Sequence, residues 1–202
     1  RGVSFEVVSE PDIARIWAQI DAANMDVVRL EKAPKIAVYT PPNAQPWDDA
    51  VTMALEYAQI PYQTIWDDDV IRGRLGEYEW LHLHHEDFTG QYSKFFITYA
   101  GAAWLQEEVA RNEEVARAGD FADVPELKKH IALSIRTYVE NGGFLFAMCS
   151  ATETLELALA ARSVDIAAAY SDGTPPDADA TSKLDWVASM AFENADVQIA
   201  PS

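Results

Sequence analysis

Residues 142–155 read GGFLFAMCSATETL. Five apolar residues run from Phe144 to Met148, two glycines precede them, and an alanine-rich pattern with helical spacing follows Thr152. A short apolar run between glycine and a helix start is typical of a buried parallel strand that turns into a helix. The sequence therefore predicts a strand–turn–helix unit, with the chain's single cysteine, Cys149, at the turn.

The neighbours of Cys149 fit a sharp turn. Ala147 and Ala151 are small, and a tight strand-to-helix turn needs small neighbours so that the central side chain points outward. Ser150, Ala151 and Thr152 begin the expected helix, so their backbone N–H groups would face the sulfur and favour the thiolate. Cys149 is therefore a candidate nucleophile. The alternative, a lone cysteine that acts as a small buried hydrophobe, stays open at this point.

Composition limits the classes of protein. The 202 residues suffice for one domain with a full core, and we expect 1–202 to form one domain with 163–202 as an irregular extension or insertion. The 33 acidic and 15 basic residues give a net charge of −18, which argues against electrostatic binding to nucleic acid or anionic membranes. A single cysteine excludes an internal disulfide. No run approaches the roughly 18 apolar residues of a membrane span.

Strand and helix patterns alternate through the middle of the chain. The expected strands are Lys35–Thr40, Tyr62–Trp66, Tyr78–His84 and Phe144–Met148. The expected helices are Ser9–Asn24, Trp47–Ile60, Val70–Leu75, Phe95–Arg117 with a break near Gly101, Val124–Glu140 and Thr152–Arg162. Weaker patterns suggest strands at Val3–Val8, at Val164–Tyr170 and from Val197. The alternation predicts an α/β fold with a parallel sheet covered on both faces, whose ligands bind at the carboxyl ends of the strands.

Polar side chains gather where the third expected strand ends. Strand alternation puts His82 and His84 on one face, and His84, His85 and Glu86 would lie near Cys149. Three interpretations compete: a base or orienting group for the cysteine, two histidines and a carboxylate around a divalent metal, or hydrogen-bonded groups that shape the loop. We take Cys149, His84, His85 and Glu86 as the catalytic candidates, and assign no metal ligands and no cofactor.

Two other polar groups have simpler interpretations. Asp67, Asp68 and Asp69 precede a short helical pattern, so we expect them to cap that helix and be solvated rather than to bind a metal. His130 lies within a long helical pattern, which indicates a surface or packing residue.

Five segments resemble a bacterial family labelled "asparagine synthetase B". They are KAPKIAVY (32–39), QPWDDAVT (45–52), WLHLHHEDFTGQY (80–92), GFLFAMCSAT (143–152) and SKLD (182–185). Members of that family resemble class I glutamine amidotransferases in fold, which implies a flavodoxin-like three-layer sandwich with a mostly parallel sheet and Cys149 on a nucleophile elbow. They are typically longer and often begin with an export signal. The resemblance therefore implies a fragment of an exported, periplasmic or secreted protein rather than a cytoplasmic one.

The resemblance supports an amidotransferase-like domain rather than asparagine synthesis, which needs an N-terminal cysteine and a Ser-Gly-Gly loop that this chain lacks. The amidotransferase motif Gly-x-Cys-x-Gly has alanines here, and no His-x-Glu follows within 150–202. We expect Cys149 to attack an amide or ester carbonyl of a small molecule, with elbow N–H groups binding the oxyanion. The alternative is a non-catalytic ligand- or metal-binding domain on the same fold. The sequence leaves the oligomeric state open.

Overall fold

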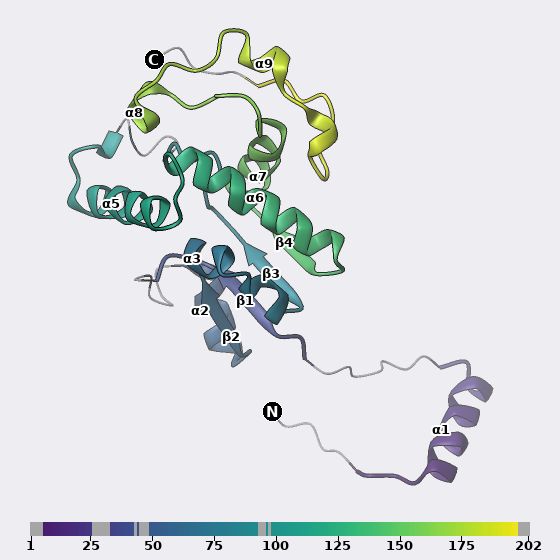
Figure 1. The fold of residues 1–202 in the computed structure, drawn as a ribbon. Coiled ribbons are helices and arrows are strands. Elements are labelled where there is room, and N and C mark those ends of the chain that lie inside the picture. Colours follow the sequence, from purple (N-terminus) through teal and green to yellow (C-terminus); the bar gives the residue numbers. More distant parts are fainter. Residues whose placement is uncertain are drawn as a thin grey trace. The chain divides into compact units, whose positions relative to one another are not determined.

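The computed structural model describes residues 6–25, 33–42, 44, 49–92, 96 and 98–197. The chain divides into two compact units, Arg1–Ala33 and Pro34–Ser202. The first unit holds the helix α1, Glu10–Ala22, labelled in Figure 1. Ser9 stands at its N-cap and donates a 2.6 Å hydrogen bond to Asp12, so the predicted helix start is confirmed. The strand predicted at Val3–Val8 is not seen in its described part, residues 6–8, which has no regular structure.

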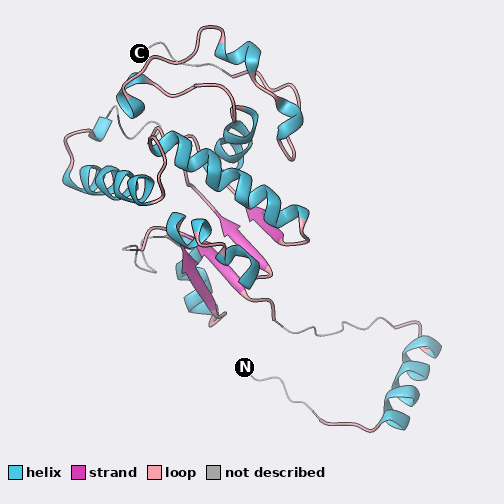
Figure 2. Cartoon of the chain, viewed as in Figure 1, coloured by secondary structure: helices cyan, strands magenta, loops and turns pink. Residues whose placement is uncertain are grey.

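In its described residues, the second unit contains a parallel sheet of four strands (Figure 2). The strands are β1 (Ile36–Tyr39), β2 (Tyr62–Ile65), β3 (Trp80–Leu83) and β4 (Phe144–Ala147). They pair in the order β2-β1-β3-β4, and every pairing is parallel. The α/β prediction is therefore confirmed, and the open parallel sheet is consistent with a flavodoxin-like sandwich.

Most helices follow the predicted pattern in the middle of the chain, but the helix predicted at Val70–Leu75 begins at Asp67 and ends at Ile71. These helices are α2 (Ala50–Ala58), α3 (Asp67–Ile71), α5 (Ala103–Ala118), α6 (Val124–Glu140) and α7 (Ser150–Ala160), with a 3₁₀ turn, η2 (Arg74–Glu77). A turn at residues 100–101 precedes α5, which confirms the break near Gly101. Asp123 caps α6 by accepting a 2.8 Å hydrogen bond from the Glu126 N–H, and Gly142 (φ 93°) follows its end.

The C-terminal region differs from the prediction in one segment. It holds α8 (Ala169–Asp172), α9 (Ala180–Lys183) and the 3₁₀ turn η3 (Trp186–Ala188). The strand predicted at Val164–Tyr170 is wrong, because this segment is irregular and then turns into α8. Its apolar residues are explained by a small separate core in which Val164 and Ile166 pack with Ala161 and Ala180. The strand expected to continue from Val197 falls on residues beyond 197, outside the described part of the chain.

One face of the sheet carries the main core. Alternate residues of β1 and β3 point to this face and are fully buried: Ala37, Tyr39, Leu81 and Leu83. They belong to one cluster with apolar residues of α6 and α7, namely Leu127, Ile131, Ile135, Leu155 and Leu159. Burial of each such leucine or isoleucine stabilises the fold by about 1.5–3 kcal/mol.

The opposite face is open at β4. Phe144 and Phe146 are 54% and 45% exposed, although the apolar run predicted a buried strand in a sheet covered on both faces. The exposure of these two side chains has a simple reason, because β4 is the last strand in the sheet order. An apolar run alone does not reveal such an edge position. Phe144 packs on Trp80, and Phe146 stacks on His82 at 5.2 Å between ring centroids.

The strand order sets the place of the site. From β1 the chain adds β2 on one side and then β3 on the other, so the order reverses at β1. In open α/β sheets the crevice at such a reversal, beyond the carboxyl ends of the strands, is the usual place for a ligand. The segments that follow the strands at this edge carry Asp49 after β1, His84 and His85 after β3, and Cys149 after β4.

Candidate functional site

Cys149 occupies the turn between β4 and α7 in a strained conformation. Its φ is 55° and its ψ is −142°, which an L-residue other than glycine rarely adopts. Such a backbone costs about 1–3 kcal/mol and persists only where the surroundings impose it. The sharp turn predicted from the small neighbours is confirmed, and the interpretation of Cys149 as a buried hydrophobe is wrong because the residue is exposed.

The first turn of α7 supplies backbone donors beside Cys149. The Thr152 N–H already donates to the Cys149 carbonyl at 3.2 Å, and the Thr152 hydroxyl donates to the same oxygen at 2.7 Å. Within the described residues, no hydrogen bond engages the N–H of Ser150 or of Ala151. Of the three predicted oxyanion donors, Ser150 and Ala151 therefore remain available, and Thr152 closes the turn instead.

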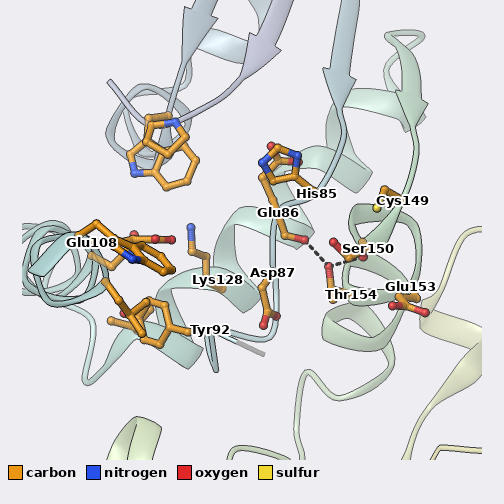
Figure 3. Close-up of a pocket in the computed structure, with 17 residues that line it drawn as sticks. His85, Glu86, Asp87, Tyr92, Glu108, Lys128, Cys149, Ser150, Glu153 and Thr154 are labelled. Atoms are coloured by element: carbon orange, nitrogen blue, oxygen red, sulfur yellow. Dashed lines mark hydrogen bonds between the residues drawn. The ribbon is translucent and has the colours of Figure 1, made fainter. Parts of the chain in front are cut away.

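Cys149 lines a pocket of about 780 Å³. This volume lies in the range of small-molecule sites, about 300–1,000 Å³. Figure 3 shows Cys149, Ser150 and Thr154 along one wall with His85 and Glu86 beside them, and Lys128, Glu108 and Tyr92 across the pocket. The other lining residues are Pro41, Trp66, Asp87, Gly90, Trp104, Leu105, Asn112, Val124 and Glu153.

One hydroxyl joins the two segments that carry the candidate residues. Thr154, in the second turn of α7, donates to the Glu86 carbonyl at 2.8 Å and also lies 2.9 Å from the Ser150 carbonyl (Figure 3). This contact links the loop after β3 to the helix that begins at Cys149. The contact therefore positions His85 and Cys149 through the backbone of their neighbouring residues and not through their own side chains.

The three clustered histidines have different surroundings. His84 is buried, and its Nε2 contacts the Asp49 Oδ2, while the His85 Nδ1 lies 3.6 Å from the same oxygen. Burial, together with the neighbouring His85 and His82, lowers the pKa of His84 to about 4, although Asp49 acts in the opposite direction. His82 is buried too, and its burial also lowers its pKa. The His85 side chain, in contrast, is 61% exposed.

Glu86 is buried beneath this cluster. Its Oε2 accepts a 2.8 Å hydrogen bond from the His84 N–H. Its Oε1 lies 3.4 Å from the His84 Nδ1, but that nitrogen makes no hydrogen bond to any described group. Burial raises the pKa of Glu86 to about 7.

The structure brings together most, but not all, of the predicted catalytic candidates. Cys149, His85 and Glu86 line one pocket, whereas His84 is not among its lining residues and contacts Asp49. Within the described part of the chain, no hydrogen bond or ion pair joins Cys149 to a histidine. His130 is exposed on α6 and packs against Phe121, as expected of a residue outside the site.

A buried ion pair at the far wall was not predicted. The Lys128 Nζ lies 2.6 Å from the Asp67 Oδ2, 3.4 Å from the Tyr39 hydroxyl and 4.4 Å from the Trp66 ring centroid. Asp67 is fully buried, so its predicted solvation is wrong. The predicted capping is confirmed by Asp69, which lies with Asp67 and Asp68 in the first turn of α3 and accepts the Trp66 N–H at 3.2 Å. The sequence offered no signal for Lys128, because a lysine in an amphipathic helix is usually solvated.

Asp49 was also missed. One oxygen, Oδ1, accepts hydrogen bonds from the Val51 and Thr52 N–H groups at 2.6 and 3.0 Å, which caps α2. The other oxygen, Oδ2, faces His84 and His85. The available signal was an aspartate directly before a helical pattern, which indicates a cap but not its histidine neighbours.

No protein-family model, curated protein or solved structure matches this chain. Among the described helices, none has the length and apolar character required to cross a membrane.

Proposed function

We propose that this chain is a class I glutamine amidotransferase-like domain whose Cys149 forms an acyl-enzyme with a small amide or ester. The observation that carries the proposal is the strained backbone of Cys149, which presents an exposed thiol at the turn from β4 into α7, beside a pocket of ligand size. Strain of this kind is concentrated at functional sites. The sequence resemblance to amidotransferase-like proteins, stated above, points to the same reaction class.

The roles follow from position. His85 is the histidine that lines the pocket with Cys149, so we assign it the proton of the thiol. The sulfur then attacks the carbonyl carbon, and the N–H groups of Ser150 and Ala151 stabilise the oxyanion. The amine or alcohol leaves with the proton from His85. Water next gives a proton to His85 and adds to the thioester, which releases the acid and restores the thiol.

In the proposed mechanism, His84 and Glu86 act indirectly, by positioning other residues. His84 is held by Asp49 and does not line the pocket, and Glu86 accepts the His84 N–H, so both position the loop that carries His85. Neither needs to touch the substrate. The proposal therefore divides the predicted catalytic set into a reacting pair, Cys149 and His85, and two positioning residues.

Acyl transfer can be tested with p-nitrophenyl acetate and intact-protein mass spectrometry. The expected result is rapid addition of one acetyl group to Cys149, followed by its loss as water hydrolyses the thioester. Cys149→Ser should abolish the rapid adduct, and His85→Gln should slow both formation and loss. The matched control is His130→Gln, on the exposed side of α6, which should behave as the wild type.

An acetyl group that appears at lysines at the same rate in Cys149→Ser would overturn the proposal. The competing function is a non-catalytic binding domain on the same fold. The specific observation in its favour is the group of Asp49, His84 and His85, whose potential ligand atoms lie close together.

A further inference from the structure

Asp49, His84 and His85 converge from two separate segments. Asp49 precedes α2, and the two histidines follow β3, so the group forms where the strand order of the sheet reverses. One ligand atom from each residue, an aspartate oxygen and two imidazole nitrogens, lies within 4.8 Å of the others. We infer that these three side chains form a binding site for one divalent transition-metal ion, of the kind that zinc or cobalt occupies.

The distances between the three ligand atoms are close to those around a divalent transition-metal ion. In a tetrahedral zinc site with bonds of about 2.1 Å, two ligand atoms lie about 3.4 Å apart, and no more than about 4.2 Å in any geometry. The His85 Nδ1 and the Asp49 Oδ2 are 3.6 Å apart, which already meets this limit. The His84 Nε2 and the Asp49 Oδ2 are in direct contact, so a metal ion would replace this contact and widen their separation. The exposed side chain of His85 is able to adjust to the same ion.

The surroundings hold two of the three ligands in fixed orientations. Asp49 is pinned because its Oδ1 accepts the Val51 and Thr52 N–H groups, which leaves Oδ2 for a ligand. His84 is buried with its Nε2 toward Asp49 and its Nδ1 toward Glu86 at 3.4 Å. The Glu86 carboxylate makes no hydrogen bond to this second nitrogen, but it lies where the outer support of a ligating histidine is usually found.

The donor set selects the kind of metal. Two imidazole nitrogens and one carboxylate oxygen favour zinc and its first-row neighbours over calcium or magnesium, which prefer oxygen donors alone. Three protein ligands leave further positions for water or another ligand. His85 also lines the Cys149 pocket, so the site adjoins that pocket.

The inference does not depend on a nucleophilic Cys149. The sulfur is not among the grouped ligand atoms, so the metal should bind equally well without it. The two roles of His85 do compete, because a metal on its imidazole removes the lone pair that would accept the thiol proton. Metal-loaded protein is therefore expected to lose the acetylation described above.

The test is titration of Co²⁺, and in parallel Zn²⁺, into chelator-treated protein, followed by visible absorption and calorimetry. The wild type should bind one equivalent, with a Co²⁺ spectrum typical of mixed nitrogen and oxygen ligands. His85→Gln and Asp49→Asn should each weaken binding by about tenfold or more. Asparagine keeps an oxygen for the α2 cap, so the second variant should remain folded.

Cys149→Ser and His130→Gln are the controls and should bind as the wild type does. Equal binding by His85→Gln and the wild type would overturn the inference. A loss of binding in Cys149→Ser would also overturn it, because it would assign the metal to the sulfur. Failure of acetylation together with normal Co²⁺ binding would contradict the proposed function alone.

Discussion

At the scale of single residues, the central feature of the site is the backbone conformation of Cys149. A φ of 55° at a residue with a Cβ is unfavourable, and the turn keeps it because Thr152 ties its N–H and hydroxyl back to the Cys149 carbonyl. The strain should therefore lower the free energy of unfolding, and a residue without a Cβ at position 149 should restore part of that free energy.

Substitution of Cys149 measures this strain. Cys149→Gly should be more stable than Cys149→Ala by about 1 kcal/mol, because glycine adopts positive φ without steric cost. Urea unfolding of both variants gives the difference. At the helical Ala151 the order should be opposite, since Ala151→Gly should lose up to about 1 kcal/mol. Equal stability of the two Cys149 variants would show that the turn stores no strain.

The local part of the site was predictable, and so was the placement of His85 and Glu86 near Cys149 at the strand ends, but the individual tertiary contacts were not. The Cys149 turn follows from neighbours within a few residues: an apolar run, small flanking side chains and a helix start. The contact of Asp49 with His84 and His85 joins residues 35 and 36 positions apart, so no local pattern could predict it. The same holds for Asp67 and Lys128, whose contact spans 61 positions.

At the scale of elements, the site depends on how α7 meets the loop after β3. Thr154 makes this contact with one hydroxyl, which donates to the Glu86 carbonyl. The acceptor is the backbone of the loop that carries His85, so loss of the hydroxyl would leave a buried carbonyl without a donor.

Thr154→Val tests the link with a side chain of the same shape. We expect a loss of about 1–2 kcal/mol in the free energy of unfolding, and slower acetylation of Cys149. Thr154→Ser keeps the hydroxyl and should retain the acetylation rate. The control is Thr137→Val on α6. Among the described residues, the Thr137 hydroxyl contacts only the Leu133 carbonyl of its own helix, so this variant should change stability by less than about 0.5 kcal/mol. A Thr154→Val protein that keeps both properties would contradict the proposed link.

The elements themselves were largely predictable because alternating strands and helices have distinct periods. The four strands of the sheet and helices α6 and α7 lie where the pattern put them, to within about two residues. The order of the strands depends on contacts far apart in sequence, which explains why the exposed edge position of β4 was missed. The apolar segment from Val164 shows the same limit, since it packs in a small core without pairing as a strand.

At the scale of the whole second unit, a buried ion pair joins the core to the pocket. Lys128 on α6 contacts Asp67 at the start of α3 and the Tyr39 hydroxyl on β1, and Tyr39 donates to Asp67. Burial and the Asp67 charge raise the pKa of Tyr39 well above its usual value, so the phenol stays protonated as a donor. Removal of one charge would leave the other buried without compensation.

Lys128→Met should therefore lower the free energy of unfolding by about 3–5 kcal/mol. The double variant Lys128→Met/Asp67→Leu should lose much less than the sum of the two single changes, since no unpaired charge remains. The control is Arg72→Met, which breaks an exposed pair with Asp68 and should cost less than about 1 kcal/mol. Urea unfolding gives all four values, and strict additivity would contradict the coupling.

The reactivity of Cys149 in metal-free protein tests the assignment of Cys149 and His85 as the reacting pair most directly. The measurement is the rate of alkylation by iodoacetamide at about pH 6.5, compared with a small thiol that ionises near pH 8.5. We expect Cys149 to react at least about tenfold faster than the small thiol, His85→Gln to remove this advantage and His130→Gln to keep it. A wild-type protein that reacts no faster than the small thiol, or a His85→Gln protein that reacts as fast as the wild type, would contradict the assignment of Cys149 and His85 as the reacting pair.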